Sequence, residues 1–294
     1  MTRKNIFFLS FLFIGAFVAA GALLFFKSAQ GNCGKGIFAL KKCAEVSSII
    51  APQKEHAVSV PEKEAVAPSS VPHAAILEKF KGKDVETVSV SEKLIALTFD
   101  GGGNAEGAED IIKILSANGI RATFFLTGNF IGKFPDIVRK ITDSGNEIAN
   151  HTATHKNFSE ISHEEATAEM EGMERAAEAL GAKLVPFFRF PYGAPTKEKI
   201  ALANERGYVA VRWTVDSLGW QGRKDGRDAS FVAARVIGKA KPGAIVLMHL
   251  GSASDGSTFD ADALEQVIIA LTQQGYRLVP LSELFTEAIK NTTP

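Results

Sequence analysis

Short apolar runs alternate with amphipathic stretches along residues 94–285 of this chain. The apolar runs have the length and the β-branched and aromatic content of buried strands. They read LIALTF, ATFFLT, EIAN, PFFRF, VAVRWTV, AIVLMHL and RLVPL. Apolar residues at helical spacing predict helices between them, over residues 108–118, 135–144, 163–180, 197–206, 231–239 and 262–274. Ser162 and Glu165 form a capping-box pattern at the start of the third helix.

This alternation predicts an α/β fold with a parallel sheet, because the connections are long enough to be crossover helices. Runs such as AIVLM, apolar at every position, suit strands that are covered on both faces. A barrel and an open doubly wound sheet both meet these conditions. Both also place an active site beyond the carboxyl ends of the strands.

The chain before residue 91 has a different character. Residues 6–26 form an uncharged apolar run after Arg3 and Lys4, long enough to cross a bilayer. We expect residues 1–27 to be a membrane anchor or, alternatively, a cleaved signal; either places the rest of the chain outside the cytoplasm, in the cell envelope or secreted. Residues 28–50 contain Cys33 and Cys43, which can close a local loop there. Residues 51–90 are expected to link this part to a domain over residues 91–290, since residues 51–72 are rich in Pro, Ala, Glu, Lys and Ser. Residues 76–91 are ambiguous and can also form a short helix and an edge segment.

Charge and glycine content narrow the classes of partner. The formal net charge is zero and no stripe of Arg and Lys with interleaved aromatics occurs, so we expect no nucleic-acid partner. The glycine run at residues 101–103 lacks the Lys-Ser/Thr of a P-loop, which argues against phosphate binding.

Titratable residues end several of the predicted strands. They are Asp100 after LIALTF, His151 after EIAN, Arg189 within PFFRF, Asp216 after VAVRWTV and His249 after AIVLM. Because parallel strands present their carboxyl ends at one rim, these side chains should converge. His151 and His155 are four residues apart, a spacing that puts both imidazoles on one face of a helical turn and suits a shared divalent metal.

In these residues the chain resembles the polysaccharide deacetylases of carbohydrate esterase family 4, over residues 94–285. The matching motifs, in order, are Thr98-Phe-Asp100, the His151/His155 pair, Arg189-Phe-Pro-Tyr-Gly193, Asp216-Ser-Leu-Gly-Trp220 and Leu247-Met-His249. The resemblance implies a distorted, incomplete (β/α) barrel of about seven parallel strands. It also implies a hydrolase that removes N-acetyl groups from a polysaccharide and uses a divalent metal, zinc or alternatively cobalt, nickel or manganese.

The resemblance further implies a role for each residue. Asp100 would be the general base, His151 and His155 the metal ligands, and His249 the acid that protonates the departing amine. Arg189 would orient Asp100, or serve only as a structural ion-pair partner.

The substrate-binding residues follow from the same motifs. A backbone N–H near Tyr192 would stabilise the oxyanion. Pro191 belongs to the substrate-binding set, and Trp220 and Leu247 would wall the acetyl pocket. Trp220 as plain core, Asp216 as a loop cap and Asp100 as a helix cap are the alternatives.

Two positions depart from the family pattern. The residue after the base, usually an aspartate that binds the metal, is Gly101, and the aspartate that usually precedes the motif tryptophan is Gly219. We expect the missing ligand to be water, Asp100 itself, or an oxygen of Asn104, Asn150 or Asp216. Asp216 is also the expected substitute for the carboxylate that tunes His249.

We expect a monomer that deacetylates peptidoglycan amino sugars, because a membrane tether would place the domain beside that polymer. Chitin-like and O-acetylated glycans are the alternative substrates. A catalytically inactive glycan-binding module, suggested by Gly101 and Gly219, is the alternative from a different class.

Overall fold

The computed structural model describes residues 72–290. The expected membrane or signal segment, the cysteine-containing segment and most of the linker lie outside these residues. Between residues 72 and 290, no helix is both long enough and apolar enough to span a membrane.

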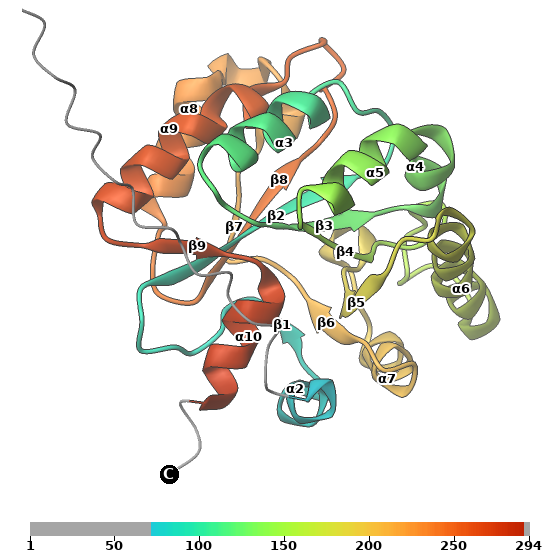
Figure 1. Ribbon diagram of the computed structural model, residues 1–294. Helices are drawn as coiled ribbons and strands as arrows, with labels where there is room; N and C mark the ends of the chain where they lie inside the picture. Colours follow the sequence, from blue (N-terminus) through green and yellow to red (C-terminus); the bar gives the residue numbers. More distant parts are fainter. Residues whose placement is uncertain (1–71, 291–294) are drawn as a thin grey trace, which may run out of the picture. The chain divides into compact units, whose positions relative to one another are not determined.

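Parallel strands form one curled sheet at the centre of the domain (Figure 1). The strands are β1 Asp84–Val85, β2 Leu94–Gly101, β3 Thr123–Leu126, β4 Glu147–Asn150, β5 Leu184–Phe188, β6 Val209–Val211, β7 Val215–Asp216, β8 Ala244–His249 and β9 Arg277–Val279. Their order is β1-β6-β5-β4-β3-β2-β8-β7, and β9 pairs with the first half of β2. The result is a half-barrel α/β fold, consistent with the incomplete barrel expected from the sequence.

Helices surround the strands in Figure 1, with α2 and α10 at one end of the sheet. They are α2 His73–Phe80, α3 Ala108–Ala117, α4 Gly128–Lys133, α5 Pro135–Asp143, α6 His163–Leu180, α7 Lys197–Glu205, α8 Ala229–Gly238, α9 Phe259–Gln273 and α10 Leu281–Lys290. Three short 3-10 turns are η1 Pro191–Gly193, η2 Gly219–Gln221 and η3 Lys224–Gly226. α6 begins at the predicted capping box of Ser162 and Glu165 and ends at Gly181, which adopts the left-handed conformation.

One predicted strand is divided in two. VAVRWTV forms β6, which pairs with β5 and β1, and β7, which pairs with β8. The residues between them change partners: the N–H of Arg212 donates to Val85 of β1, and the N–H of Thr214 donates to Ile245 of β8. The prediction of a single strand was wrong, because an apolar run does not show where the chain changes its pairing partner.

The domain begins before the predicted boundary at residue 91. α2 and β1 lie within the stretch expected to be linker, yet β1 pairs with β6 and the ring of Phe80 lies 4.7 Å from that of Phe285 in α10. Ile76 and Phe80 are buried. α10 and α4 were also not predicted, because short helices carry too few turns for a clear period.

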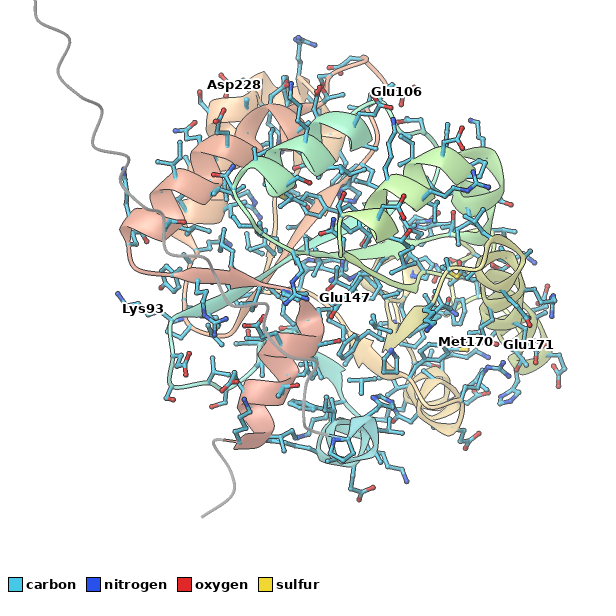
Figure 2. All side chains as sticks on the ribbon, viewed as in Figure 1. Lys93, Glu106, Glu147, Met170, Glu171 and Asp228 are labelled. Atoms are coloured by element: carbon cyan, nitrogen blue, oxygen red, sulfur yellow. The ribbon has the colours of Figure 1, made fainter. Side chains whose placement is uncertain are left out.

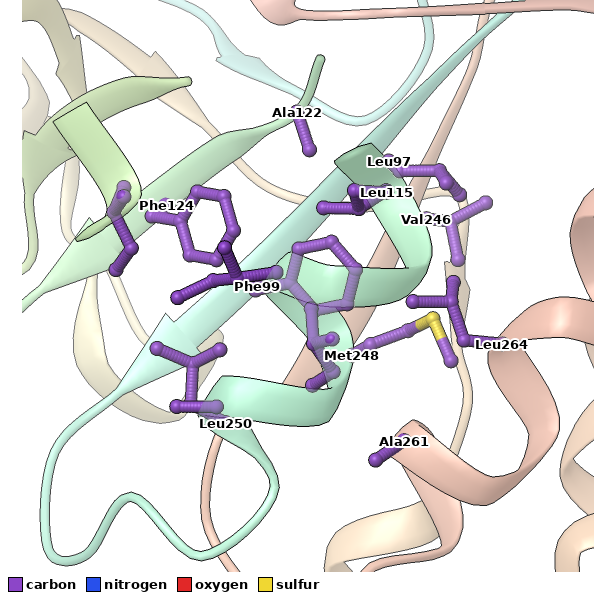
Figure 3. Packing of buried hydrophobic residues seen from close by; sticks show 14 of the residues in the cluster. Leu97, Phe99, Leu115, Ala122, Phe124, Val246, Met248, Leu250, Ala261 and Leu264 are labelled. Carbon is purple, nitrogen blue, oxygen red and sulfur yellow. The ribbon is translucent and has the colours of Figure 1, made fainter. Parts of the chain in front are cut away.

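Alternating residues of the strands face two different cores. Leu97 and Phe99 of β2 belong to the outer core beneath the helices, whereas Ala96 faces the inner core of the curled sheet. In the outer core, Phe99 stacks on Phe124 of β3 with ring centroids 5.2 Å apart (Figure 3). Phe285 of α10 joins the inner core. This alternation decides which side chains lie on each face of the sheet.

The amino ends of the strands carry structural polar contacts. Glu147 of β4, labelled in Figure 2, accepts hydrogen bonds at Oε2 from Thr123 Oγ1 at 2.7 Å and from the N–H of Ser282 at 3.3 Å. Burial raises the pKa of Glu147, although these hydrogen bonds lower it in part. These contacts tie β3, β4 and α10 together at the amino ends of the strands.

Candidate active site

A cavity of about 730 Å³ opens beyond the carboxyl ends of the strands. The predicted site residues that line it are Asp100, His151, His155, Tyr192, Asp216, Trp220, Leu247 and His249. Arg189 and Pro191 are buried and do not line it. Gly102 and Gly103 also line the cavity, where they present backbone rather than side chains.

Strand alternation explains why these side chains meet. The site side chains on or directly after β2, β4, β5 and β8 each lie an even number of residues after one that faces the inner core. The series are Ala96–Thr98–Asp100, Ala149–His151, Phe187–Arg189 and Ile245–Leu247–His249. The inner face of the sheet therefore carries apolar side chains toward the amino ends of the strands and titratable side chains at their carboxyl ends.

The same alternation turns position 101 away from the cavity. A Cβ atom added to Gly101 would lie 2.7 Å from Leu126 Cδ2, 3.0 Å from Leu250 Cδ1 and 3.3 Å from Phe130 Cδ2. A side chain at this position would therefore enter the outer core. The departure at Gly101 leaves the local backbone well packed rather than leaving a gap in the cavity wall.

Arg189 is fully buried and donates four hydrogen bonds. Nη1 donates to Asp100 Oδ1 at 2.6 Å, Nη2 to Thr98 Oγ1 at 2.9 Å and to Arg212 O at 3.1 Å, and Nε to Val211 O at 3.3 Å. Burial by itself raises the pKa of Asp100, but the guanidinium and the nearby imidazoles outweigh it and hold that pKa below its usual range. Asp100 is therefore an ionised carboxylate with one oxygen, Oδ2, not bound by Arg189.

The two histidines come together in a loop and not on a helical turn, as the spacing had suggested. Thr152 and His155 have positive φ angles of 72° and 67°, which bring the two imidazole centroids to 4.8 Å. His151 Nδ1 lies 2.9 Å from the backbone oxygen of Arg189, and its Nε2 lies 3.4 Å from Asp100 Oδ2. Burial lowers the pKa of His151 to about 4 and also lowers that of His155. Both rings are neutral at pH 7, the state that binds a metal.

The donor set fits a divalent cation held by His151 and His155. A neutral imidazole whose Nδ1 is fixed by a backbone oxygen is the usual arrangement of a metal-binding histidine. Asn150 and Asn104 are already used, the first by Met170, Tyr208 and Thr152, the second by Ser252. Across the described part of the chain, no three His, Cys, Asp or Glu side chains are grouped to hold a metal. The remaining positions around such a cation would fall to water and substrate.

The loop that carries His155 is held by α6, a support that the sequence did not reveal. Glu169 is buried and accepts hydrogen bonds from the N–H and Oγ1 of Thr154, at 2.7 and 2.6 Å. A Cβ atom at Gly172, one turn further along α6, would lie 2.7 Å from the Cβ of Ala153. The close approach of helix and loop therefore requires glycine at position 172.

Gly172→Ala should lower zinc affinity by about tenfold, the scale seen when support of a ligand is lost. Alanine usually stabilises a helix by about 0.5–1 kcal/mol relative to glycine, but here the methyl group would push the His155 loop away. Gly238→Ala in α8 is the matched control, because nothing lies within 4 Å of the added Cβ. Thermal unfolding and zinc titration calorimetry measure both effects. If the two variants gained Tm equally and bound zinc equally, the close contact would have no role.

His249 has a carboxylate partner that was assigned wrongly from the sequence. The partner is Asp260 of α9, whose Oδ2 lies 3.5 Å from His249 Nδ1 and accepts the backbone N–H of His249 at 2.9 Å. Asp216, the expected partner, accepts the N–H of Leu218 and Nε1 of Trp220 instead, at 2.9 and 3.2 Å. One hint of this role was present in the sequence: Asp260 lies in the first turn of a helix whose other residues are largely apolar.

The pKa of His249 shifts opposite to those of the other two histidines. Burial by itself lowers it, but the charge of Asp260, with smaller contributions from Asp100 and Asp216, raises it above the usual value. The site therefore holds two neutral imidazoles, an ionised carboxylate and an imidazole biased toward its protonated form.

Aromatic side chains form the rim of the cavity. Tyr192 is 68% exposed and its ring centroid lies 4.8 Å from that of His155. Trp220 is 48% exposed, so its interpretation as plain core was wrong. Leu247 lines the cavity from a buried position. Asp100 is not a helix cap, since Gly107 occupies the N-cap of α3.

Residues 87–211 match the family model described as polysaccharide deacetylase. The chain is 33% identical to a peptidoglycan-N-acetylglucosamine deacetylase of Bacillus cereus, over 65% of this chain and 68% of the relative. It is 32% identical to a chitooligosaccharide deacetylase of Bradyrhizobium sp., over 65% of this chain and 90% of the relative. Its fold matches that of a family 4 carbohydrate esterase pseudoenzyme from Bacillus anthracis with a TM-score of 0.65 and 28% identity, over 71% of each chain.

Proposed function

The chain belongs to the polysaccharide deacetylase family, and from this premise we propose that it removes N-acetyl groups from peptidoglycan amino sugars with the aid of a divalent cation. The observation that carries the proposal is the arrangement of side chains around one cavity: Asp100 bound by Arg189, the His151 and His155 rings side by side, and His249 against Asp260. His151 and His155 are neutral and suited to a cation, whereas His249 is biased toward the acid form. Groups whose pKa values are pushed apart in this way are typical of acid–base catalysis.

The reaction joins water to an acetamide and releases acetate and a free amine. A divalent cation held by His151 and His155 would lower the pKa of the attacking water and polarise the acetamide carbonyl. Asp100 Oδ2 accepts the proton that the water loses, while Arg189 keeps the carboxylate ionised and oriented. The C–N bond then breaks, and His249 gives its proton to the departing nitrogen. Trp220 and Leu247 line the part of the cavity that would hold the acetyl group.

An inactive glycan-binding module is less well supported than an enzyme. Such a module needs no ionised Asp100, no guanidinium buried beside it and no paired His249. All three are present, and the packing at Gly101 shows that position 101 contributes no wall to the cavity. The similarity to a pseudoenzyme concerns the fold, whereas activity depends on these side chains.

The test is acetate release from purified peptidoglycan by the full chain, loaded with zinc, stripped by a chelator and reloaded. We expect release with zinc, loss after stripping and recovery on reloading. His249→Ala should lower the rate by about 10²- to 10⁴-fold, the usual contribution of a general acid. Chitooligosaccharide and O-acetylated xylan serve as parallel substrates. Release from xylan alone would replace the proposed substrate, and no release from any glycan would reject the activity.

We further propose that the chain acts in the cell envelope, held by residues 1–27. The proposal rests on the uncharged apolar run after Arg3 and Lys4. Cell fractionation, with protease added to intact spheroplasts, tests it. Recovery of the chain in the cytosol, protected from protease, would contradict it.

A further inference from the structure

We propose that Asp260 is the positioning residue of His249 and that it occupies the space left by Gly219. This inference rests on the proposed function, in which His249 protonates the departing amine. Asp260 belongs to the first turn of α9, whereas His249 ends β8. The two residues are therefore brought together by the loop over residues 250–258.

Asp260 contacts both the backbone and the ring of His249. Oδ2 of Asp260 accepts the N–H of His249 at 2.9 Å and lies 3.5 Å from its Nδ1. Asp260 is only 3% exposed. Its Oδ1 and the Nδ1 of His249 are buried and have no hydrogen-bond partner among residues 72–290. A buried carboxylate facing a buried ring nitrogen favours a proton on Nδ1 and leaves Nε2 for the cavity.

Gly219 makes room for this carboxylate. A Cβ atom at position 219 would lie 2.5 Å from Oδ1, 2.6 Å from Cγ and 2.8 Å from Oδ2 of Asp260. These distances are far inside van der Waals contact, so a side chain at 219 and the carboxylate of Asp260 exclude each other. Glycine at position 219 is therefore what allows the carboxylate of Asp260 to lie beside His249.

A second glycine and aspartate hold the same two loops together. A Cβ atom at Gly222 would lie 2.7 Å from both carboxylate oxygens of Asp255. Asp255 accepts the N–H of Arg223 at 2.7 Å and the N–H of Ser257 at 3.0 Å. The segment carrying Trp220 is therefore docked on the segment that follows His249, which fixes Gly219 against Asp260.

The other charges around His249 cannot replace this contact. Asp100 on β2, Asp216 on β7 and His155 on the loop after β4 interact with His249 electrostatically, but the effect of Asp260 is the largest of the charges. Asp100 is bound by Arg189, and Asp216 by Leu218 and Trp220. Asp260 is the carboxylate in direct contact with the ring.

The test measures the pKa of His249 by NMR in the full chain, labelled with ¹³C-histidine and solubilised in detergent. The chain has 6 histidines, so His249→Gln assigns the signal. Asp260→Asn should lower the pKa of His249 by about one unit or more, as loss of a neighbouring opposite charge does. Asp262→Asn is the matched control, since Asp262 is exposed on the same helix turn and its side chain accepts a hydrogen bond from Thr258; it should leave the pKa of His249 unchanged.

Two further measurements separate positioning from folding. Gly219→Ala should also lower the pKa of His249, because its methyl group displaces the carboxylate. In both variants the alkaline limb of the kcat/KM profile should move to lower pH by the same shift, because the acid must be protonated. An unchanged pKa in both variants would overturn the proposal, and if Asp260→Asn does not fold, Gly219→Ala alone decides. The NMR titration tests the contact between Asp260 and His249 even if the chain deacetylates no glycan. Failure of the proposed function can therefore be distinguished from failure of this inference.

Discussion

Asp100→Asn should lower kcat/KM for glycan deacetylation by about 10³-fold, the scale of a lost general base. The amide keeps the shape of the side chain and an oxygen for Arg189, but it does not take a proton from the attacking water. Asp100 Oδ2 is the oxygen placed for that transfer, 3.4 Å from His151 Nε2. The initial rate of acetate release, normalised to folded protein by circular dichroism, measures the effect.

The control for this change is Asp136→Asn. Asp136 is 87% exposed at its side chain and, among residues 72–290, pairs with Arg139 on the same helix. Its removal should leave the rate unchanged, because exposed ion pairs contribute little. A rate for Asp100→Asn within tenfold of the parent, a loss too small for a general base, would mean that another group takes the proton.

Arg189→Met should cost about 3–5 kcal/mol of the free energy of unfolding, the usual cost of breaking a buried ion pair from one side. Methionine fills part of the volume but leaves Asp100 charged, and it leaves Thr98 and two backbone oxygens without their donor. Urea unfolding of the full chain measures the loss. Because the pKa of Asp100 is depressed in the folded state, the pair stabilises the fold above the unfolded pKa of about 4 and loses this effect as the pH falls.

The double variant Asp100→Asn/Arg189→Met provides the control. It removes both charges, so its loss of stability should be smaller than the sum of the two single losses. Arg139→Met, at an exposed pair, should change stability by less than about 0.5 kcal/mol. Strict additivity of the two buried changes would show that Asp100 and Arg189 are not energetically coupled.

Much of the fold followed from local pattern. The alternation of apolar runs and amphipathic stretches predicted β2, β3, β4, β8 and most of the helices, because burial on both faces leaves consecutive apolar residues. The division of VAVRWTV and the helix α10 could not be predicted in this way, and the pattern over residues 76–91 left a short helix there only as an alternative. Their placement depends on partners such as Val85, Ile245 and Phe285 that are remote in sequence.

The sequence by itself determined which residue types end the strands, and this was enough to collect Asp100, His151, Arg189 and His249 at one rim. The reason is the two-residue period of a strand, which carries one face of the sheet from apolar core to cavity without any tertiary information. Only the tertiary structure decided that the histidine pair meets in a loop with positive φ angles, and that position 101 faces the outer core.

The carboxylate beside His249 was likewise decided by the tertiary structure. Asp216 is nearer to the motif tryptophan in sequence, but its oxygens are taken by the loop that it begins. Asp260 reaches His249 because α9 packs where Gly219 has no side chain. Mutual exclusion between two side chains is a property of shared volume, and no pattern along the chain records it.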